Sequence, residues 1–253
     1  MYLDVIDFRN FYSEQLGRTV RREIRTTIAR RWSSVGDQRI LGFGYATPFL
    51  DPFRTDAERV FAFMPAQQGV VNWPSSDESA TALVDEDALP LPDACLDRIL
   101  VVHALEHSDR PRELLREFWR VLAPGGRILI VVPNRRGYLA RVDRTPFGFG
   151  RPFSRGQLTS LLRETLFSPV SWGPALYMTP VPRFMSIELT HRLARVGALL
   201  SPAFAGAIYV EATKQMYQGV TESRRKRLAN ALKPVLVPAP SAMSLDPRKD
   251  QAG

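Results

Sequence analysis

The chain has 253 residues, of which 45% are apolar and 24% charged, a balance that suits one globular domain with a sizeable core. Its single cysteine, Cys95, excludes an internal disulfide framework and a zinc site built on clustered cysteines, so a reducing setting is expected. No apolar run approaches the roughly 20 residues that span a bilayer, and the N-terminus lacks the pattern of a secretory signal. We therefore expect a soluble, cytoplasmic protein.

The formal net charge is +8, and arginine is concentrated near the two ends of the chain. Residues 1–34 are predicted to form a basic helical segment, in which Val20, Ile24 and Ile28 recur at a spacing of four. A second basic cluster occupies residues 224–227. Such a charge favours anionic partners, namely nucleic acid, an acidic membrane surface or an acidic protein. The alternative is a solvated basic helix and a frayed tail, because charge alone does not specify a partner.

Short apolar segments alternate with helical patterns along the chain, and seven of them are predicted as strands. They are residues 39–44, 59–64, 82–87, 97–103, 127–133, 169–178 and 206–213. The fourth and fifth are apolar on both faces, as expected for central strands. Between these two, residues 108–126 predict an amphipathic helix that ends at Pro124-Gly125-Gly126. A strand, a helix and a strand at this spacing indicate a parallel sheet with a right-handed crossover.

The pattern loosens after the fifth strand. Residues 135–155 are rich in Gly, Pro and Arg and are predicted to form a flap beside the strand ends, while residues 154–167 return to helix. Residues 180–203 indicate a helical elaboration within a central domain of residues 35–215. Residues 216–253 form a basic tail with a proline-spaced, polar composition, which we expect to be disordered in isolation.

The segment LPLPDACLDRILVVHALEHSDRPRELLREFWRVLAPGGRILIVVPN, residues 89–134, closely resembles class I S-adenosylmethionine-dependent methyltransferases of the small-molecule type. In that family an LPxPDxxFD segment leads into the fourth strand, and xxLEH, a helix ending in RVLxPGG and a strand ending in PN follow. The resemblance implies an α/β fold with a doubly wound, mainly parallel seven-stranded sheet, which is Rossmann-like. It also implies that residues 206–213 form an antiparallel last strand and that the cofactor is S-adenosylmethionine.

In open α/β sheets, ligands bind beyond the carboxyl ends of the strands, so the loop after the first strand is the first to consider. The family has approximately acid-x-Gly-x-Gly-x-Gly there, and this chain has Gly42, Gly44, Ala46 and Pro48 in the corresponding places. Gly44 and Ala46 stay small where the backbone must approach the cofactor. Gly42 stands in the place of an acid, and Pro48 removes a backbone donor. The resemblance therefore implies a cofactor loop that has lost part of its contacts.

The ends of the second and third strands carry the other cofactor contacts of the family. After the second strand the family usually has an acid for the ribose hydroxyls, whereas this chain has Met64, with Gln67 and Gln68 close behind. A glutamine can bind a ribose, but a charge-assisted bond is about twice as strong as a neutral one. In the family, residues after the third strand bind the adenine, and this chain has Asp87, Ala88 and Leu89 there. A strand-end turn is an equal alternative for Asp87.

Two of the three histidines lie in the segment HALEH, residues 103–107, which matches the zinc pattern H-x-x-E-H. That pattern needs one continuous helix, but here it follows a strand and precedes a helix that starts with proline, so we predict no metal site. The resemblance places His103 at the end of the fourth strand, facing the cofactor's sulfonium and the substrate, where it is the candidate general base. The alternative for His103 is a polar cap on the strand. Glu106 and His107 are expected to make local hydrogen bonds.

Two functions remain open at this point. The first is an S-adenosylmethionine-dependent methyltransferase with a small or lipid-like acceptor that enters under the flap. Its predicted substrate-binding residues are Asn134, Arg135, Arg136 and Arg151, whose guanidinium groups suit a carboxylate or phosphate. Methyl transfer needs little machinery beyond alignment of donor and acceptor, so the lack of a nucleophile does not oppose it. The second is a catalytically inactive methyltransferase-like scaffold or regulatory protein, which binds nucleic acid or an acidic partner through its basic ends.

Overall fold

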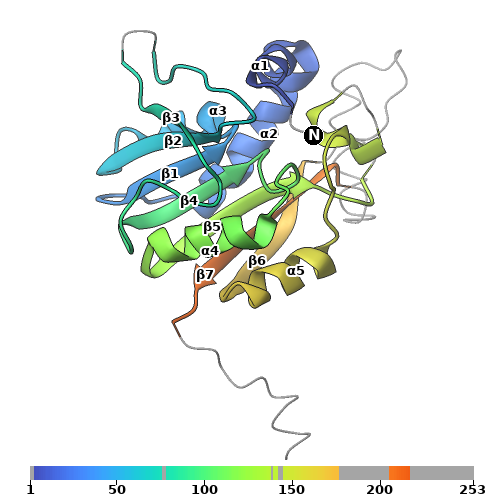
Figure 1. Cartoon of the computed structure of the whole chain (residues 1–253). Helices are drawn as coiled ribbons and strands as arrows, with labels where there is room; N and C mark the ends of the chain where they lie inside the picture. Colours follow the sequence, from blue (N-terminus) through green and yellow to red (C-terminus); the bar gives the residue numbers. More distant parts are fainter. Residues whose placement is uncertain (1–2, 76–77, 138, 142–144, 177–204, 217–253) are drawn as a thin grey trace, which may run out of the picture. The chain divides into compact units, whose positions relative to one another are not determined.

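The computed structural model describes residues 3–75, 78–137, 139–141, 145–176 and 205–216, which are coloured in Figure 1. The predicted helical elaboration at 180–203 lies outside the described residues, and so does the predicted tail beyond residue 216, with the basic cluster at 224–227. No helix in the described part of the chain is long and apolar enough to cross a membrane.

In the part of the chain that the structure describes, seven strands form one sheet in the order β3-β2-β1-β4-β5-β7-β6. Their bounds are β1 Arg39–Gly44, β2 Arg59–Pro65, β3 Thr81–Val84, β4 Leu96–Val102, β5 Leu122–Pro133, β6 Phe167–Leu176 and β7 Ala207–Lys214. The pairs from β3 to β5 are parallel, and β7 is antiparallel to both of its neighbours. The prediction of a doubly wound, mainly parallel sheet is confirmed. The strand order reverses between β1 and β4, and such a switch point is where ligands bind in this class of sheet.

Among the described residues, five α-helices accompany the sheet, namely α1 Val5–Ser13, α2 Gln15–Arg31, α3 Thr47–Leu50, α4 Pro111–Val121 and α5 Arg155–Glu164. Side chains alternate across a strand, so each face of the sheet has its own core. On one face Ile40 and Leu100 pack in a cluster with Ile24 of α2, whereas on the other Leu41 packs in a cluster with Phe118 of α4. Figure 1 accordingly shows α4 and α5 on the face of the sheet opposite to α2.

The strand β5 begins earlier than predicted. The segment Pro124-Gly125-Gly126 does follow the end of α4, but β5 already starts at Leu122 rather than at residue 127. Leu122 pairs with Leu96 before a register shift leads to the regular pairing of Arg98 with Arg127. Gly125 has φ +76°, which a glycine adopts without strain, so the irregular start of the strand depends on it.

The sequence predicted residues 1–34 as one basic helical segment, whereas the structure separates the start of this segment as a short helix, α1. The carboxylate of Asp4 caps its start by accepting from the amide of Ile6, and Val5, Phe8 and Tyr12 form part of its buried side. Only Glu14 separates α1 from α2. A Cβ atom on Gly17 would lie 1.8 Å from the carbonyl oxygen of Phe11, so this sharp junction requires glycine.

Candidate functional site

The site centres on His103, which directly follows β4 at the switch point of the sheet. Its backbone has φ +52°, a left-handed conformation that is strained for a residue other than glycine, and its side chain is buried. Gly44, at the end of the neighbouring β1, has φ +76°, and a Cβ atom there would lie 2.5 Å from the carbonyl oxygen of Val102. The ends of β1 and β4 are therefore pressed together, and only a glycine fits on the β1 side.

Three elements far apart in the sequence meet at the imidazole and backbone of His103. Its Nε2 lies 2.8 Å from the hydroxyl of Tyr12 on α1, and its Nδ1 lies 3.2 Å from Oε1 of Glu106. The carbonyl oxygen of His103 accepts from Nε2 of Gln68, which follows β2. A carboxylate can only accept, so Nδ1 carries the proton that it donates to Glu106. Burial raises the pKa of Tyr12 well above its ordinary value, so Tyr12 stays protonated and donates to Nε2 of His103.

Aromatic rings enclose this histidine. The ring of Phe8 on α1 lies 4.8 Å from the His103 ring and stacks on Tyr45 at 5.1 Å, centroid to centroid. Phe147, from the predicted flap, meets His103 edge-on at 4.9 Å. Tyr12 stacks on Tyr45 at 5.6 Å. The helix α1 and the flap thus cover the end of β4 and exclude water from it.

The residues of the H-x-x-E-H pattern come together, although they lie on a turn and not on a helix. One ligand atom each of His103, Glu106 and His107 lies within 4.8 Å of the others, and all three residues are buried. Both ring nitrogens of His103, however, already take part in hydrogen bonds. A metal ion there would have to displace Tyr12 or Glu106, so the arrangement favours a hydrogen-bonded base over a ligand set.

The resemblance placed Gly42 in the cofactor loop, at the position of the family's acid, and the structure differs from this expectation. A Cβ atom on Gly42 would lie 2.5 Å from Cδ1 of Leu50 and 2.9 Å from Cβ of Ala46, so an acid at this position would meet packed side chains and not a cofactor. Ala46 is fully buried beside it. Pro48 lies in the first turn of α3, where a missing amide donor costs nothing. Gly44 remains as the residue that permits a close approach of the backbone.

The end of β2 also differs in detail from the prediction. Met64 is fully buried in the core on the α2 face. Gln67 is exposed, whereas Gln68 is buried, and its amide Oε1 has no hydrogen-bond partner among the described residues. Oε2 of Glu106 is likewise a buried acceptor without a described hydrogen bond. Both acceptors belong to side chains that bond His103 through their other polar atom. Such buried acceptors are costly to leave unsatisfied, which points to a ligand with hydroxyl or amine donors.

The segment from Asp87 to Leu89 forms a strand-end turn. The amide of Asp87 donates to Oδ1 of Asp85, and its exposed carboxylate pairs with the guanidinium group of Arg110. Ala88 is exposed, and Leu89 is buried with its amide bound to Oε2 of Glu117. The turn follows β3 at the carboxyl edge of the sheet, so its place suits the predicted adenine contact even though Asp87 has a structural partner.

The four predicted substrate-binding residues do not gather at one point. The side-chain amide of Asn134 donates to the carbonyl of Ala205 and its Oδ1 accepts from the amide of Arg136, so Asn134 shapes the loop after β5. Arg135 and Arg136 are exposed. The exposed guanidinium group of Arg151 lies 3.6 Å from Asp109, while its backbone amide donates to the carbonyl of Glu106. The flap therefore contacts the site through its backbone and Phe147.

Sequence reasoning missed Tyr12 and Phe8, which contact His103 directly. The available signal was a capping residue, Asp4, followed by apolar residues at helical spacing, which is the usual mark of a helix start. It also left Gln67 and Gln68 undecided. The turn after β2 resolves the choice, because it directs Gln68 inward and Gln67 outward.

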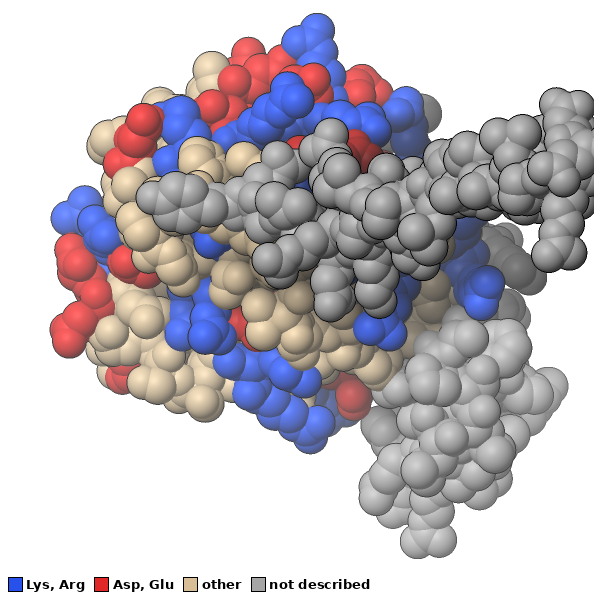
Figure 2. All heavy atoms as spheres, turned by 90° about the horizontal axis from the view of Figure 1, so that it is seen from below, with Lys and Arg blue, Asp and Glu red and all other residues tan. Residues whose placement is uncertain are grey.

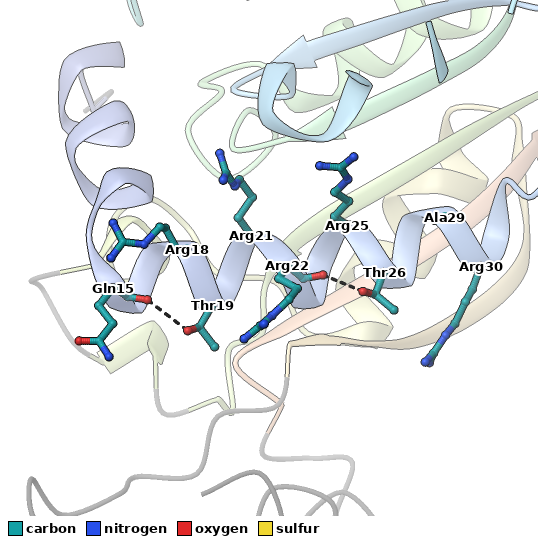
Figure 3. A pocket seen from close by; sticks show the side chains of 9 residues that line it. All are labelled: Gln15, Arg18, Thr19, Arg21, Arg22, Arg25, Thr26, Ala29 and Arg30. Atoms are coloured by element: carbon teal, nitrogen blue, oxygen red, sulfur yellow. Dashed lines mark hydrogen bonds between the residues drawn. The ribbon is translucent and has the colours of Figure 1, made fainter. Parts of the chain in front are cut away.

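A second feature lies on α2, away from His103. A surface pocket of about 970 Å³ is lined by Gln15, Arg18, Thr19, Arg21, Arg22, Arg25, Thr26, Ala29 and Arg30. Figure 3 shows Arg21 and Arg25 on one side of the helix and Arg22 and Arg30 on the other. We call the five arginines of this pocket the α2 arginine surface. None of them forms an ion pair with an acid in the described part of the chain.

Comparison with known proteins gives a consistent picture. Residues 41–130 match the family described as "Methyltransferase domain". A probable S-adenosylmethionine-dependent methyltransferase of Mycobacterium tuberculosis is 31% identical over 121 residues, which are 47% of this chain and 43% of that protein. A second such protein, from Mycolicibacterium smegmatis, is 36% identical over 81 residues, which are 31% of either chain. The chain thus spans less than half the length of the curated relatives it matches.

Solved structures agree on the fold. A methyltransferase of Thermotoga maritima superposes with a TM-score of 0.56 at 17% identity, covering 83% of this chain and 96% of the other. A methyltransferase of Archaeoglobus fulgidus gives 0.55 at 18% identity, covering 77% and 94%. At such identities the likeness concerns the fold alone.

Proposed function

We propose that this chain, whose residues 41–130 match a methyltransferase domain, is an S-adenosylmethionine-dependent enzyme that methylates a small or lipid-like acceptor. The observation that carries the proposal is the buried, unsatisfied Oε1 of Gln68 at the end of β2. It lies on a side chain that is itself bonded to His103, at the switch point of the sheet. An acceptor atom in that place suits a ribose hydroxyl.

The residues present fit the cofactor in part. Gly44 provides the close approach, Gln68 the ribose contact, and the turn of Asp87 to Leu89 the place for the adenine. The acid of the family's first loop has no equivalent, because Gly42 faces Leu50. When bound, S-adenosylmethionine supplies a methyl group on a positively charged sulfur, so alignment with the acceptor provides much of the rate.

The side chains around His103 supply the proton chemistry. Nε2 of His103 is the nitrogen that takes a proton from the acceptor, because Nδ1 is already protonated and bound to Glu106. The buried carboxylate of Glu106 holds the tautomer and stabilises the imidazolium that results. The rings of Phe8, Tyr45 and Phe147 keep water from competing for that nitrogen.

Calorimetric titration with S-adenosylmethionine and S-adenosylhomocysteine tests the cofactor site. We expect a Kd of about tens of micromolar for the parent, since two charge-assisted contacts of the family are missing. Gln68→Met keeps the size of the side chain and removes the acceptor, so binding should weaken by about 5- to 10-fold.

Gln67→Met is the matched control, because Gln67 is the exposed neighbour of Gln68. If Gln68→Met and Gln67→Met bind the cofactor with equal affinity, Gln68 is not part of the cofactor site. No heat of binding at millimolar cofactor in the parent would refute the proposed function itself.

The α2 arginine surface favours a second function, that of a methyltransferase-like protein that docks on nucleic acid. Five exposed guanidinium groups on one helix attract phosphates. On the face of the molecule that Figure 2 draws, Lys and Arg side chains are interspersed with Asp and Glu. Within the described chain Arg18 donates to the carbonyl of Ser13, and the other four have no described hydrogen bond to an acid. This surface is compatible with catalysis elsewhere, so the two functions can coexist.

A further inference from the structure

The hydroxyl of Tyr12 occupies the one atom of His103 that a methyl acceptor would need. Glu106 binds Nδ1, so Nε2 is the only ring nitrogen able to accept a proton, and Tyr12 donates to it at 2.8 Å. Tyr12 is 3% exposed and His103 1% exposed, so an acceptor cannot share this nitrogen with the phenol in the conformation described. The protein therefore places its own phenol where an acceptor's polar hydrogen must go.

The surroundings of the Tyr12 ring are those of a slot for a flat aromatic group. Tyr45 stacks on it at 5.6 Å with an interplanar angle of 12°, and Phe49 meets it edge-on at 5.8 Å and 85°. Neither residue belongs to α1, since both come from the first loop and α3. Burial raises the pKa of Tyr45 to about 12, so it remains a neutral stacking surface. Both walls of the slot therefore belong to parts of the chain other than α1.

The helix α1 is held by contacts that can be released without breaking the sheet. At its start the amide of Val5 donates to the carbonyl of Gln68, and at its end a single residue, Glu14, joins it to α2. Ile6 is 50% exposed on its outer side. The contact of the Tyr12 ring with Tyr45 and Phe49 is one of the contacts that fix α1, beside its packing against α2, and the ring of an aromatic ligand could replace it.

Resting on the proposed function, we propose that the methyl acceptor is a phenol, which displaces Tyr12 from His103 and lies in the slot between Tyr45 and Phe49. Its hydroxyl donates to Nε2 of His103, which takes the phenolic proton, and Glu106 stabilises the charge that forms. The phenolate oxygen would then bond to the methyl group as the bond between that methyl group and the sulfur of S-adenosylmethionine breaks, which would leave S-adenosylhomocysteine. The helix α1 closes the slot with an internal copy of the same chemical group when no acceptor is present.

A rescue experiment without cofactor tests the slot. Tyr12→Ala removes the phenol, and 4-methylphenol has the size and chemistry of the missing side chain. At millimolar concentration it should raise the Tm of Tyr12→Ala by at least about 2 °C, and clearly more than toluene, which lacks the hydroxyl. Tyr12→Phe keeps the slot filled and should show no shift.

Phe11→Ala is the matched control on the same helix, because Phe11 contacts Tyr12 and Phe147 but has no described contact with His103. In Phe11→Ala, 4-methylphenol and toluene should change the Tm by the same amount. If toluene raises the Tm of Tyr12→Ala as much as 4-methylphenol does, the slot does not recognise a hydroxyl group and the proposal is wrong. If 4-methylaniline raises the Tm more than 4-methylphenol does, the acceptor is an aromatic amine and not a phenol.

If Tyr12→Ala does not fold, hydrogen exchange of the parent decides the question. Saturating 4-methylphenol should speed exchange at the amides of residues 5–13, whereas toluene should not. Unchanged protection of α1 would overturn the proposal. Neither measurement involves S-adenosylmethionine. A negative result would therefore concern the phenol slot alone, whereas the calorimetric titration of the parent reports whether the cofactor binds.

Discussion

At the scale of single residues, backbone strain and close contacts mark the site. His103 has a positive φ without being a glycine, and it keeps this conformation because the hydrogen bonds to Tyr12, Glu106 and Gln68 hold it. Gly44 accepts the close approach of the β4 end from the other side. The strain is thus supported by residues that only the fold brings together, so the sequence could indicate His103 as a candidate but not its partners.

Gly42→Asp tests whether the first loop can regain the acid of the family. The new side chain would meet Leu50 and Ala46 at 2.5 and 2.9 Å, and its carboxylate would be buried without a described partner. We expect a loss of about 3 kcal/mol or more in the free energy of unfolding. Urea denaturation measures it. The control is Gly36→Asp, where a Cβ atom meets nothing within 4 Å. A Gly42→Asp variant as stable as the parent and with tighter cofactor binding would contradict this packing.

At the scale of elements, strands were predictable because buried parallel strands are continuous apolar runs. The predicted first strand has the bounds of β1, and the segment between β4 and β5 gave the crossover helix α4. The helix α1 lies within the predicted helical segment 1–34, but its separation from α2 and its contacts with the site escaped prediction. Its role depends on contacts with Tyr45 and His103, which lie more than thirty residues away in sequence.

The helix α4 also fixes the segment that follows the predicted adenine turn. Glu117 accepts from the amide of Leu89 and from Arg120, which in turn donates to the carbonyl groups of Leu89 and Leu91. The hydrogen bond from Arg120 is the main cause that lowers the pKa of Glu117 below its ordinary value. The chain from Leu89 onward is therefore held to α4 by a carboxylate that must stay ionised.

This pairing predicts a pH dependence with a definite sign. Because the pKa of Glu117 is lower in the folded than in the unfolded state, its stabilisation is complete above the unfolded pKa and is lost as the pH falls through the folded one. Glu117→Gln should cost about 1–2 kcal/mol at pH 7, and the difference from the parent should shrink toward pH 3. Thermal unfolding over this range measures it, with exposed Glu113→Gln as the control. A difference that grows on acidification would contradict the assignment.

At the scale of the whole molecule, the fold and the charge have separate origins. The switch point between β1 and β4 follows from strand order, which the resemblance indicated, while the excess of arginine belongs in part to α2 on the surface. The periodicity of Val20, Ile24 and Ile28 predicted which side of α2 is buried. No pattern in the sequence could show that the α2 arginines form no ion pair with an acid in the part of the chain that the structure describes, because ion pairs depend on how side chains are placed in space.

Salt dependence separates a phosphate-binding surface from a merely solvated helix. If the α2 arginine surface binds single-stranded nucleic acid, the affinity should fall steeply with salt, with a slope of about −0.7 per phosphate contact in a plot of log K against log salt. Arg22→Gln, Arg25→Gln and Arg30→Gln combined should then reduce the magnitude of the slope by about 2. Fluorescence anisotropy with an unstructured oligonucleotide at several salt concentrations measures it. Arg116→Gln with Arg163→Gln, two exposed arginines on α4 and α5, is the control and should change the slope little. If the control lowers the slope as much as the α2 variant, the binding is diffuse attraction to the net charge of +8 and not docking on α2.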